Sequence, residues 1–304
     1  MLRIGIDGGG TTTRAIVINE NLQVLGRGEA GSSNHYSVGL KRLAQHVQQA
    51  VDSALNAAGA SPDEVVSWGL GLAGACTPTE QTALYESLSP LAAGKTLVVD
   101  EDAAAAQAGA FAGGAGAVSI AGTGANCFGI NEQGIRARAD GLGPLLGDRG
   151  SGYWIGEYTL RAVCRANDGS GPPTALLEAV LQQLEIASVD ELVQLVYRPD
   201  FERDRIAALF PVVVKCAAEH DVVAQQTLES AGRELAITAR TVLQKLEIAR
   251  VAISGGVLQR DTPVRSSFEA TLRESIPDVE VQEPQYDAAV GAALLARPTG
   301  SDSK

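Results

Sequence analysis

The segment at residues 7–12 reads Asp-Gly-Gly-Gly-Thr-Thr and joins two apolar runs near the start of the chain. Apolar residues alternate on both sides of it, which predicts two strands and a hairpin turn between them, turn 1 (residues 8–12). Glycine and threonine here can aim backbone N–H and hydroxyl groups at a phosphate, and Asp7 can hold Mg²⁺ through water. The candidate phosphate ligands are Gly9, Gly10, Thr11 and Thr12. The alternative is an ordinary tight turn.

A similar segment opens the second half of the chain, where residues 120–126 read Ile-Ala-Gly-Thr-Gly-Ala-Asn. It also follows an apolar strand and precedes another, so it predicts turn 2 (residues 122–124). Its candidate phosphate ligands are Gly122, Thr123 and Gly124. Two such turns, one in each half, can clamp one polyphosphate from opposite sides. The pair therefore predicts a site for a polyphosphate.

Other glycine patterns do not predict a dinucleotide or P-loop fold. Residues 26–31 and 69–74 both match GxGxxG. The first does not lead directly into a helix, and the second lacks an acidic residue in a strand about 20 positions later. No GxxxxGK[ST] segment occurs in the chain. A dinucleotide-binding fold is therefore not expected.

Turn 1 is expected to lie in a first half of the chain that contains both strands and helices. Strands are expected at residues 2–6, 15–18, 24–26, 64–71 and 95–100. Apolar residues spaced three and four apart predict a helix from Leu40 that stops at Gly59, and further helices are expected at residues 79–88 and 102–111.

The second half repeats the order of three strands and then becomes helical. Strands are expected at residues 117–121, 127–130 and 135–139, and helices dominate residues 152–246 with a loop at 167–173. Strands at 250–254 and 280–282 and a helix at 288–296 complete the pattern. The polar tail from Pro298 is expected to be disordered.

Length and composition limit the class of protein. The chain has 304 residues, of which 45% are hydrophobic and 20% charged, which predicts two folded lobes. A net charge of −12 disfavours nucleic acid and anionic membranes as partners. No apolar run is long enough for a membrane span, and no signal peptide is present, so we expect a cytoplasmic protein. Widely spaced cysteines and three scattered histidines predict no structural zinc.

Several motifs resemble one known superfamily. The segments DGGGTTT (7–13), AGTGAN (121–126) and SGGV (254–257) resemble the phosphate-1, phosphate-2 and adenosine motifs of the actin, Hsp70 and sugar-kinase superfamily. Within it, the chain resembles N-acetylglucosamine kinases of the BadF/BadG/BcrA/BcrD ATPase group. That closer resemblance is carried by GSSNHY (31–36), DEDAAAA (100–106) and DGLGPLLGDRGSGYWIG (140–156). It covers nearly the whole chain and is weakest over residues 160–245.

The resemblance implies an α/β, two-lobed actin-like (ribonuclease H-like) ATPase fold with a nucleotide and sugar cleft between the lobes. The N-terminal lobe would comprise residues 1–114 plus 287–304, and the C-terminal lobe residues 115–286. The implied activity is ATP-dependent phosphorylation of the 6-hydroxyl of an amino sugar, with Mg²⁺ as cofactor. N-acetylglucosamine is the expected acceptor, and glucosamine and N-acetylmuramic acid are the alternatives. Similar kinases are commonly homodimers, so a homodimer is expected.

Phosphoryl transfer to an alcohol needs a base near the hydroxyl, and an ordinary carboxylate suffices because the proton leaves late. Asp100, Glu101 and Asp102 are the candidates at the junction of a strand and a helix. The resemblance favours Asp102 as the catalytic base and as a sugar contact. An acidic residue at a helix start can instead be only an N-cap.

The resemblance also implies binding residues. Asp148 would accept hydrogen bonds from sugar hydroxyls, with Asn34 and Gly143 as further sugar contacts. The alternative for Asp148 is a capping role. Gly255 and Gly256 would let the adenosine approach the backbone, although packing of a strand on a helix explains these glycines equally well.

Two other classes of function are alternatives to a kinase. An activator ATPase of 2-hydroxyacyl-CoA dehydratases shares the phosphate motifs but bridges an iron–sulfur cluster with cysteines, and the wide cysteine spacing argues against it. A sugar-sensing regulator would need a DNA-binding domain of about 60 residues before the first strand. The chain begins that strand at Leu2 and is acidic, which disfavours a regulator.

Overall fold

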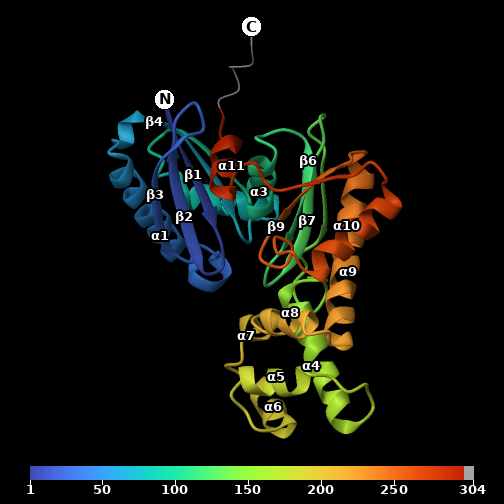
Figure 1. Ribbon diagram of the computed structural model, residues 1–304. Helices are drawn as coiled ribbons and strands as arrows, with labels where there is room; N and C mark the ends of the chain where they lie inside the picture. Colours follow the sequence, from blue (N-terminus) through green and yellow to red (C-terminus); the bar gives the residue numbers. More distant parts are fainter. Residues whose placement is uncertain (298–304) are drawn as a thin grey trace. The chain divides into compact units, whose positions relative to one another are not determined.

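The computed structural model describes residues 1–297, which divide into two compact units (Figure 1). Unit 1 comprises Met1–Gly116 and the segment from Pro284, and unit 2 comprises Ala117–Glu283. These limits lie within a few residues of the expected lobe limits. The expectation of a disordered tail from Pro298 falls outside the described residues.

Unit 1 is built on a five-stranded sheet with the order β3-β2-β1-β4-β5. Strands β1, β2 and β3 are antiparallel neighbours, and β4 and β5 run parallel to β1. All five strands expected from the sequence are present: β1 (Leu2–Gly8), β2 (Thr12–Ile18), β3 (Val24–Gly31), β4 (Val65–Leu72) and β5 (Thr96–Glu101). Because β1, β4 and β5 are parallel, their carboxyl ends meet at one edge of the sheet.

Helices cover both faces of this sheet. Ile4 and Ile6 of β1 pack in one core with α1 (His35–Ala58), whereas Ile16 and Ile18 of β2 pack in another with α3 (Asp102–Ala110) and α11 (Ala288–Leu295). The alternation of side chains along a strand produces this division. The short helix η1 (Pro62–Glu64) precedes β4, and α2 (Pro78–Leu88) precedes β5.

Helix α11 approaches the sheet closely because two strand positions are glycine. A Cβ on Gly5 would overlap the Ala289 carbonyl oxygen, and one on Gly69 would overlap that of Ala292. The GxGxxG pattern of residues 26–31 has a similar cause, since Gly28 contacts the backbone of α1. These glycines allow helix packing and need no nucleotide to explain them.

Helix α1 begins differently from the sequence prediction. Its first residue is His35, but Gly39 has φ 73° and ψ 160°, which interrupts the helix before Leu40. The long amphipathic part therefore starts at Leu40, as the apolar spacing predicted. It ends at Gly59, whose left-handed backbone (φ 62°) forms the expected C-cap.

Unit 2 contains a second five-stranded sheet with the order β10-β9-β6-β7-β8. Its strands are β6 (Gly116–Ala121), β7 (Ala125–Ile130), β8 (Arg136–Asp140), β9 (Arg250–Ser254) and β10 (Glu280–Gln282), and all five were expected. Read from β8, the order matches that of the first sheet read from β3. The predicted repeat of three strands is therefore present in the topology.

The rest of unit 2 is mainly helical. Its helices are α4 (Gly152–Asp168), α5 (Leu176–Gln183), α6 (Val189–Val196), α7 (Arg203–Ala207), α8 (Phe210–Ala218), α9 (Val222–Leu246) and α10 (Pro263–Ser275). The gap between α4 and α5 contains most of the predicted loop. Helix α10 was not predicted, although Val264, Phe268 and Leu272 are buried at a spacing of four. It packs against α9 beside the sheet (Figure 1).

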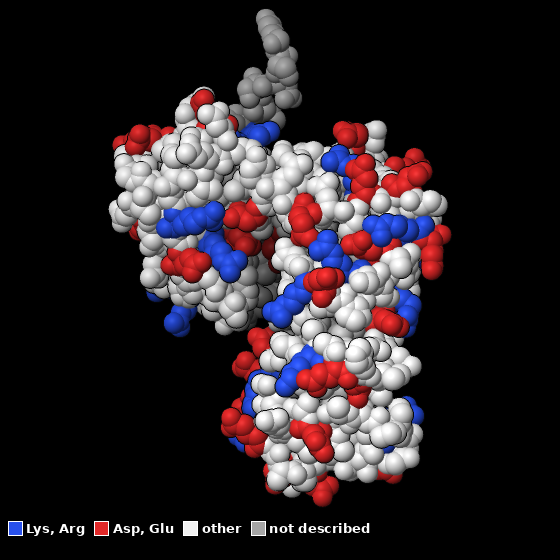
Figure 2. All heavy atoms as spheres, viewed as in Figure 1, with Lys and Arg blue, Asp and Glu red and all other residues white. Residues whose placement is uncertain are grey.

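The surface carries charges of both signs. On the face drawn in Figure 2, acidic and basic side chains are interspersed over both units. Among residues 1–297, no helix combines the length and apolar character that crossing a bilayer requires.

Candidate active site

Turn 1 is fixed by backbone hydrogen bonds from neighbouring loops. The Gly9 N–H donates to the Thr12 carbonyl at 3.0 Å, which closes the hairpin. The Ala73 N–H donates to the Gly8 carbonyl at 2.8 Å, and the Ser33 N–H donates to the Gly9 carbonyl at 3.3 Å. At the tip, Gly10 is exposed, and a Cβ built on it would meet no atom within 4 Å. The tip therefore has room for a ligand to approach the backbone.

Asp7 and Asp102 lie at the same edge of the first sheet. Asp7 precedes turn 1 and is paired in register with Gly71 of β4, which is paired with Asp100 of β5. Asp102 follows β5 directly as the first residue of α3. Burial raises the pKa of Asp7 to about 6, and the negative charge of Asp102 contributes to the increase. Asp7 and Asp102 are far apart in the sequence, and the parallel pairing of β1, β4 and β5 brings them to the same edge of the sheet.

Arg14 is the cation that faces Asp7. Its Nη1 lies 3.9 Å from Asp7 Oδ2, and its charge lowers the pKa of Asp7. The negative charge of Asp287, the N-cap of α11, has the opposite effect to Arg14 and raises the pKa of Asp7. Asp7 therefore carries a carboxylate whose negative charge is incompletely compensated.

The three neighbouring acids differ in exposure. Asp100 is 5% exposed and Glu101 is 8% exposed, whereas Asp102 is partly exposed. Asp100 Oδ1 accepts hydrogen bonds from the Glu101 N–H at 2.9 Å and from Gln81 Nε2 at 3.4 Å. Asp102 Oδ1 accepts one from the Ala103 N–H at 2.8 Å, and the N-cap position belongs to Glu101. Of the three, Asp102 is the most accessible to a substrate.

Asn34 has a structural role in unit 1. It is the N-cap of α1, and its Oδ1 accepts a hydrogen bond from the Tyr36 N–H at 3.0 Å. The Tyr36 hydroxyl donates to Glu80 Oε1 at the start of α2. Through these contacts, the loop after β3 is tied to α2. The sugar-binding role of Asn34 stays a prediction.

Turn 2 is supported by the N-terminus of a helix. The Gly152 N–H donates to the Gly122 carbonyl at 2.8 Å, and the Tyr153 N–H donates to the Thr123 carbonyl at 3.2 Å. Both donors belong to the first turn of α4, whose N-cap is Ser151. The positive end of a 17-residue helix therefore lies beside turn 2, which favours an anion there.

Asp148 lies against turn 2 and does not cap α4. It is 5% exposed, and its Oδ1 accepts a hydrogen bond from the Ala125 N–H at 3.3 Å. Burial raises the pKa of Asp148 above its usual range, while the Ala125 hydrogen bond and Arg203 lower it. The alternative capping role is wrong, because Ser151 occupies the N-cap. Unit 2 thus brings a candidate sugar ligand beside candidate phosphate ligands.

The loop that carries Asp148 is organised by a residue that the sequence analysis missed. Asp140 ends β8, and its side chain is fully buried. Its carboxylate accepts hydrogen bonds from the Gly141 N–H (2.8 Å), the Asp148 N–H (2.7 Å), the Arg149 N–H (3.1 Å) and Arg149 Nε (3.2 Å). Its place at the start of the 140–156 motif was the available signal. Gly143 lies inside this loop with φ 80°.

A pocket of about 280 Å³ lies within unit 2 and joins two of the predicted motifs. Residues that line it include Gly122, Thr123, Gly152, Phe210, Gly256 and Arg260. A Cβ on Gly256 would meet no atom within 4 Å, so this glycine faces open space. Gly255 has φ 88°, and a Cβ there would overlap the Ala121 carbonyl, so the local backbone alone requires glycine at this position. The two glycines therefore differ: Gly255 has a structural reason, whereas Gly256 borders open space.

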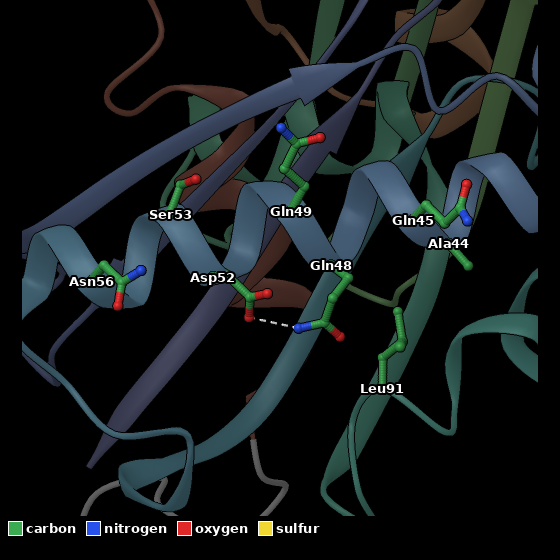
Figure 3. Close-up of a pocket in the computed structure, with 8 residues that line it drawn as sticks. All are labelled: Ala44, Gln45, Gln48, Gln49, Asp52, Ser53, Asn56 and Leu91. Carbon is green, nitrogen blue, oxygen red and sulfur yellow. Dashed lines mark hydrogen bonds between the residues drawn. The ribbon is translucent and has the colours of Figure 1, made fainter.

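A larger groove of about 520 Å³ follows α1 in unit 1 (Figure 3). It is lined by Ala44, Gln45, Gln48, Gln49, Asp52, Ser53, Asn56 and Leu91. Gln48 Nε2 donates to Asp52 Oδ1 at 2.6 Å across one helical turn. None of the predicted site residues lines this groove, so it is not part of the candidate site.

The cysteines differ in accessibility. Cys127 and Cys216 are buried in the core of unit 2, and burial raises the pKa of both thiols. Cys76 is exposed, and Cys164 is partly exposed. Within residues 1–297, no three or more histidine, cysteine or acidic side chains form a metal-binding group. Two of the four thiols are therefore unavailable for a cluster shared between subunits.

Two known kinases are similar to this chain in sequence. N-acetylmuramic acid/N-acetylglucosamine kinase of Clostridium acetobutylicum is 30% identical over 298 residues, which cover 97% of each chain. N-acetyl-D-glucosamine kinase of Dictyostelium discoideum is also 30% identical and aligns with 96% of this chain and 97% of its own.

The fold agrees with solved structures as well. A candidate N-acetylglucosamine kinase from Chromobacterium violaceum matches 97% of this chain and 99% of its own, with 28% identity and a TM-score of 0.79. The expected α/β ATPase fold class is thereby confirmed. The sequence profile of the BadF/BadG/BcrA/BcrD ATPase family matches residues 4–296. The chain belongs to the BadF/BadG/BcrA/BcrD ATPase family.

Proposed function

We propose that the protein is an ATP-dependent amino-sugar kinase that phosphorylates the 6-hydroxyl of N-acetylglucosamine. The observation that carries this proposal is the similarity, over at least 96% of the chain, to two kinases named for that sugar. Asp102 and Asp148 are carboxylates of the kind that such a reaction requires, and each lies beside a glycine- and threonine-containing turn. ATP is the phosphate donor.

Asp102 is the proposed catalytic base. The bond between the sugar O6 and the γ-phosphorus forms while the bond between that phosphorus and ADP breaks. The proton of the 6-hydroxyl moves to the Asp102 carboxylate late in the reaction, when the oxygen has become acidic. Asp102 is partly exposed, whereas Asp100 and Glu101 are buried, which supports this role.

The residues beside turn 1 fit a magnesium ion and phosphate groups. The Asp7 carboxylate has a pKa raised to about 6, so a nearby divalent cation would stabilise its charged form. Mg²⁺ neutralises charge on the transferred phosphate when it is bound. Asp7 is the proposed ligand, through water, with the phosphates on Gly9, Gly10, Thr11 and Thr12. On unit 2, the proposed phosphate ligands are Gly122, Thr123 and Gly124.

The remaining roles concern the sugar and the adenosine. Asp148 accepts hydrogen bonds from sugar hydroxyls, with Asn34, Gly143 and Asp102 as further contacts. Gly255 and Gly256 are proposed to contact the adenosine, and the pocket of about 280 Å³ beside Gly256 supports this placement. We place the reaction in the cytoplasm because it consumes ATP, and a homodimer stays a prediction.

A coupled assay of ADP release tests the function. The purified protein is given ATP with a panel of amino sugars and plain hexoses, with and without Mg²⁺. We expect Mg²⁺-dependent ADP release that is fastest with N-acetylglucosamine. Faster turnover of glucosamine or N-acetylmuramic acid would change the acceptor, and the absence of sugar-dependent ADP release would contradict the kinase.

A further inference from the structure

Asp140 holds together the two ends of the loop at residues 140–149. Its Oδ1 accepts from the N–H groups of Gly141 and Asp148, and its Oδ2 accepts from the N–H and Nε of Arg149. Three of these four donors are backbone groups. Because its side chain is fully buried, water does not compete for these bonds.

The loop needs this support because its backbone is strained. Asp140 has φ 66° and Asp148 has φ 55°, so both adopt the left-handed conformation that glycine favours. This conformation is unfavourable for residues other than glycine, although less so for aspartate than for most. The hydrogen bonds to Asp140 lie at these two positions and offset the cost. Gly147 provides the space, since a Cβ there would overlap Asp140 Oδ1.

The conformation of Asp148 decides where its carboxylate lies. With the observed backbone, Asp148 Oδ1 accepts from the Ala125 N–H, and a Cβ on Gly124 would lie 2.9 Å from Asp148 Oδ2. A carboxylate has about four acceptor positions, so Asp148 can bind sugar hydroxyls while it holds Ala125. Its direction therefore depends on the bond between its own N–H and Asp140.

We propose that Asp140 is a positioning residue for sugar binding, which fixes the backbone of Asp148 so that the Asp148 carboxylate is held beside turn 2. This inference rests on the proposed function, in which Asp148 receives the sugar. Asp140 does not touch the sugar and acts through Asp148. The ion pair of Asp140 with Arg149 is secondary, because the Arg149 side chain is 50% exposed and such pairs contribute little.

The substitution Asp140→Asn tests the proposal with little change in shape. Asparagine tolerates the left-handed backbone. Its side chain has only one acceptor oxygen, and its NH₂ group cannot accept the hydrogen bonds that the second carboxylate oxygen accepts. We expect the KM and Kd for the sugar to rise about 10- to 100-fold, while the KM for ATP changes much less. Equal increases in both KM values, or unchanged sugar affinity, would overturn the positioning role.

Two control variants separate the parts of this arrangement. Arg149→Gln keeps all three backbone donors, so we expect a smaller change in sugar affinity than for Asp140→Asn. Glu269→Gln removes a carboxylate that accepts from Arg265 and Arg273 on α10, and it should leave the sugar KM unchanged. A loss of sugar affinity in Glu269→Gln would show that general destabilisation of unit 2 is the cause.

The pH dependence provides a readout that a purely structural role would not move. The charged groups that face Asp148 are Arg203, Asp140 and Arg138, and Asp140 adds to the rise in the pKa of Asp148 caused by burial. Release of the Asp148 carboxylate from Ala125 removes a hydrogen bond that lowers this pKa, and that hydrogen bond acts on the pKa more strongly than the charge of Asp140 does. The acid limb of kcat/KM for the sugar should therefore move to higher pH in Asp140→Asn, and an unmoved limb or a move to lower pH counts against the proposal.

Hydrogen exchange tests the geometry without catalysis. The Ala125 amide donates to Asp148, so its exchange should be faster in Asp140→Asn than in the wild type, and unchanged protection would overturn the proposal. If Asp140→Asn does not fold, Gly147→Ala is the second variant, because its added methyl group displaces Asp140 Oδ1. We expect the same loss of sugar affinity from it.

The failure of the proposed function has a different signature. A wild-type protein without sugar-dependent ADP release contradicts the kinase, and the positioning role is lost with it. An active wild type in which Asp148→Asn loses sugar affinity but Asp140→Asn does not contradicts only the inference about Asp140.

Discussion

The carboxylates beside turn 1 and turn 2 are compensated in opposite ways. Beside turn 1, Asp7 is near two other acids, Asp102 and Asp287, and its cation Arg14 is at 3.9 Å. Burial is the main cause of the raised pKa of Asp7, about 6, and these two acids add to it. The Asp7 carboxylate therefore keeps a negative charge that a metal ion or a proton can neutralise.

Beside turn 2, the carboxylates are held by hydrogen bonds. Asp140 accepts four, and Asp148 accepts one from Ala125 while donating its own N–H to Asp140. This difference supports the proposed division of work between the units. In that proposal, the acids of unit 1 take part in the chemistry, and those of unit 2 bind in a fixed geometry.

The largest effect that this division predicts is the loss of turnover in Asp102→Asn. Removing a general base lowers kcat by about 100- to 10,000-fold, while the KM values for sugar and ATP change little. Steady-state kinetics measure the effect, and Asp100→Asn is the matched control. If Asp100→Asn loses turnover and Asp102→Asn does not, the catalytic role belongs to Asp100.

The second effect is expected at Asp148. The variant Asp148→Asn keeps the left-handed backbone but loses the charge that accepts sugar hydroxyls. We expect the KM for the sugar to rise about 10- to 100-fold, with a smaller change in kcat. Asp200→Asn, on the surface of the same unit, is the control. If Asp148→Asn lowers kcat and leaves the KM for the sugar unchanged, Asp148 serves the chemistry, and the proposed difference in role between the two units is contradicted.

The third effect is on stability. The folded pKa of Asp7 is above the ordinary 3.8, so folding favours its protonated form and stability falls as pH rises from about 4 to 6. Asp7→Asn removes this penalty, and at pH 7 its free energy of unfolding should exceed that of the wild type by about 1–3 kcal/mol. At pH 3 the two proteins should differ little. Urea titrations at both pH values measure this, and an equal difference at both contradicts the raised pKa.

The smallest effect concerns Arg14. Its positive charge lowers the pKa of Asp7, so Arg14→Gln should raise that pKa further. The shift is small because the arginine is largely exposed and solvent screens its charge. A pH titration of stability should show the loss of stability extending to higher pH than in the wild type. A shift in the opposite direction would mean that Arg14 does not act on Asp7.

Local patterns predicted much of the fold. Alternating apolar residues and short apolar segments predicted all ten strands, and the left-handed C-cap at Gly59 ended α1 where expected. The spacing of Val264, Phe268 and Leu272 also carried a helical signal for α10, but the short segment between two strands was not recognised as a helix. The break at Gly39 was not predicted, because glycine alone does not indicate which backbone conformation it adopts.

The candidate site was less predictable than the fold. The junction of β5 and α3 indicated where a catalytic acid would lie, and exposure then distinguished Asp102 from its neighbours. The role of Asp140 was not predictable, because its partners meet only when Asp140 and Asp148 adopt a left-handed backbone that few non-glycine residues adopt. The common pocket of Gly122 and Gly256 arises from the pairing of β6 with β9, which are more than a hundred residues apart.

The glycines beneath α11 have a consequence for biosynthesis. Strand β1 leaves the ribosome long before α11, yet its Gly5 contacts α11 only when Ala289 has been synthesised. The residues of unit 2 form one continuous segment between them. During translation, unit 2 can therefore complete its core while the nascent first sheet still exposes one apolar surface, which a chaperone or a neighbouring ribosome's product can reach.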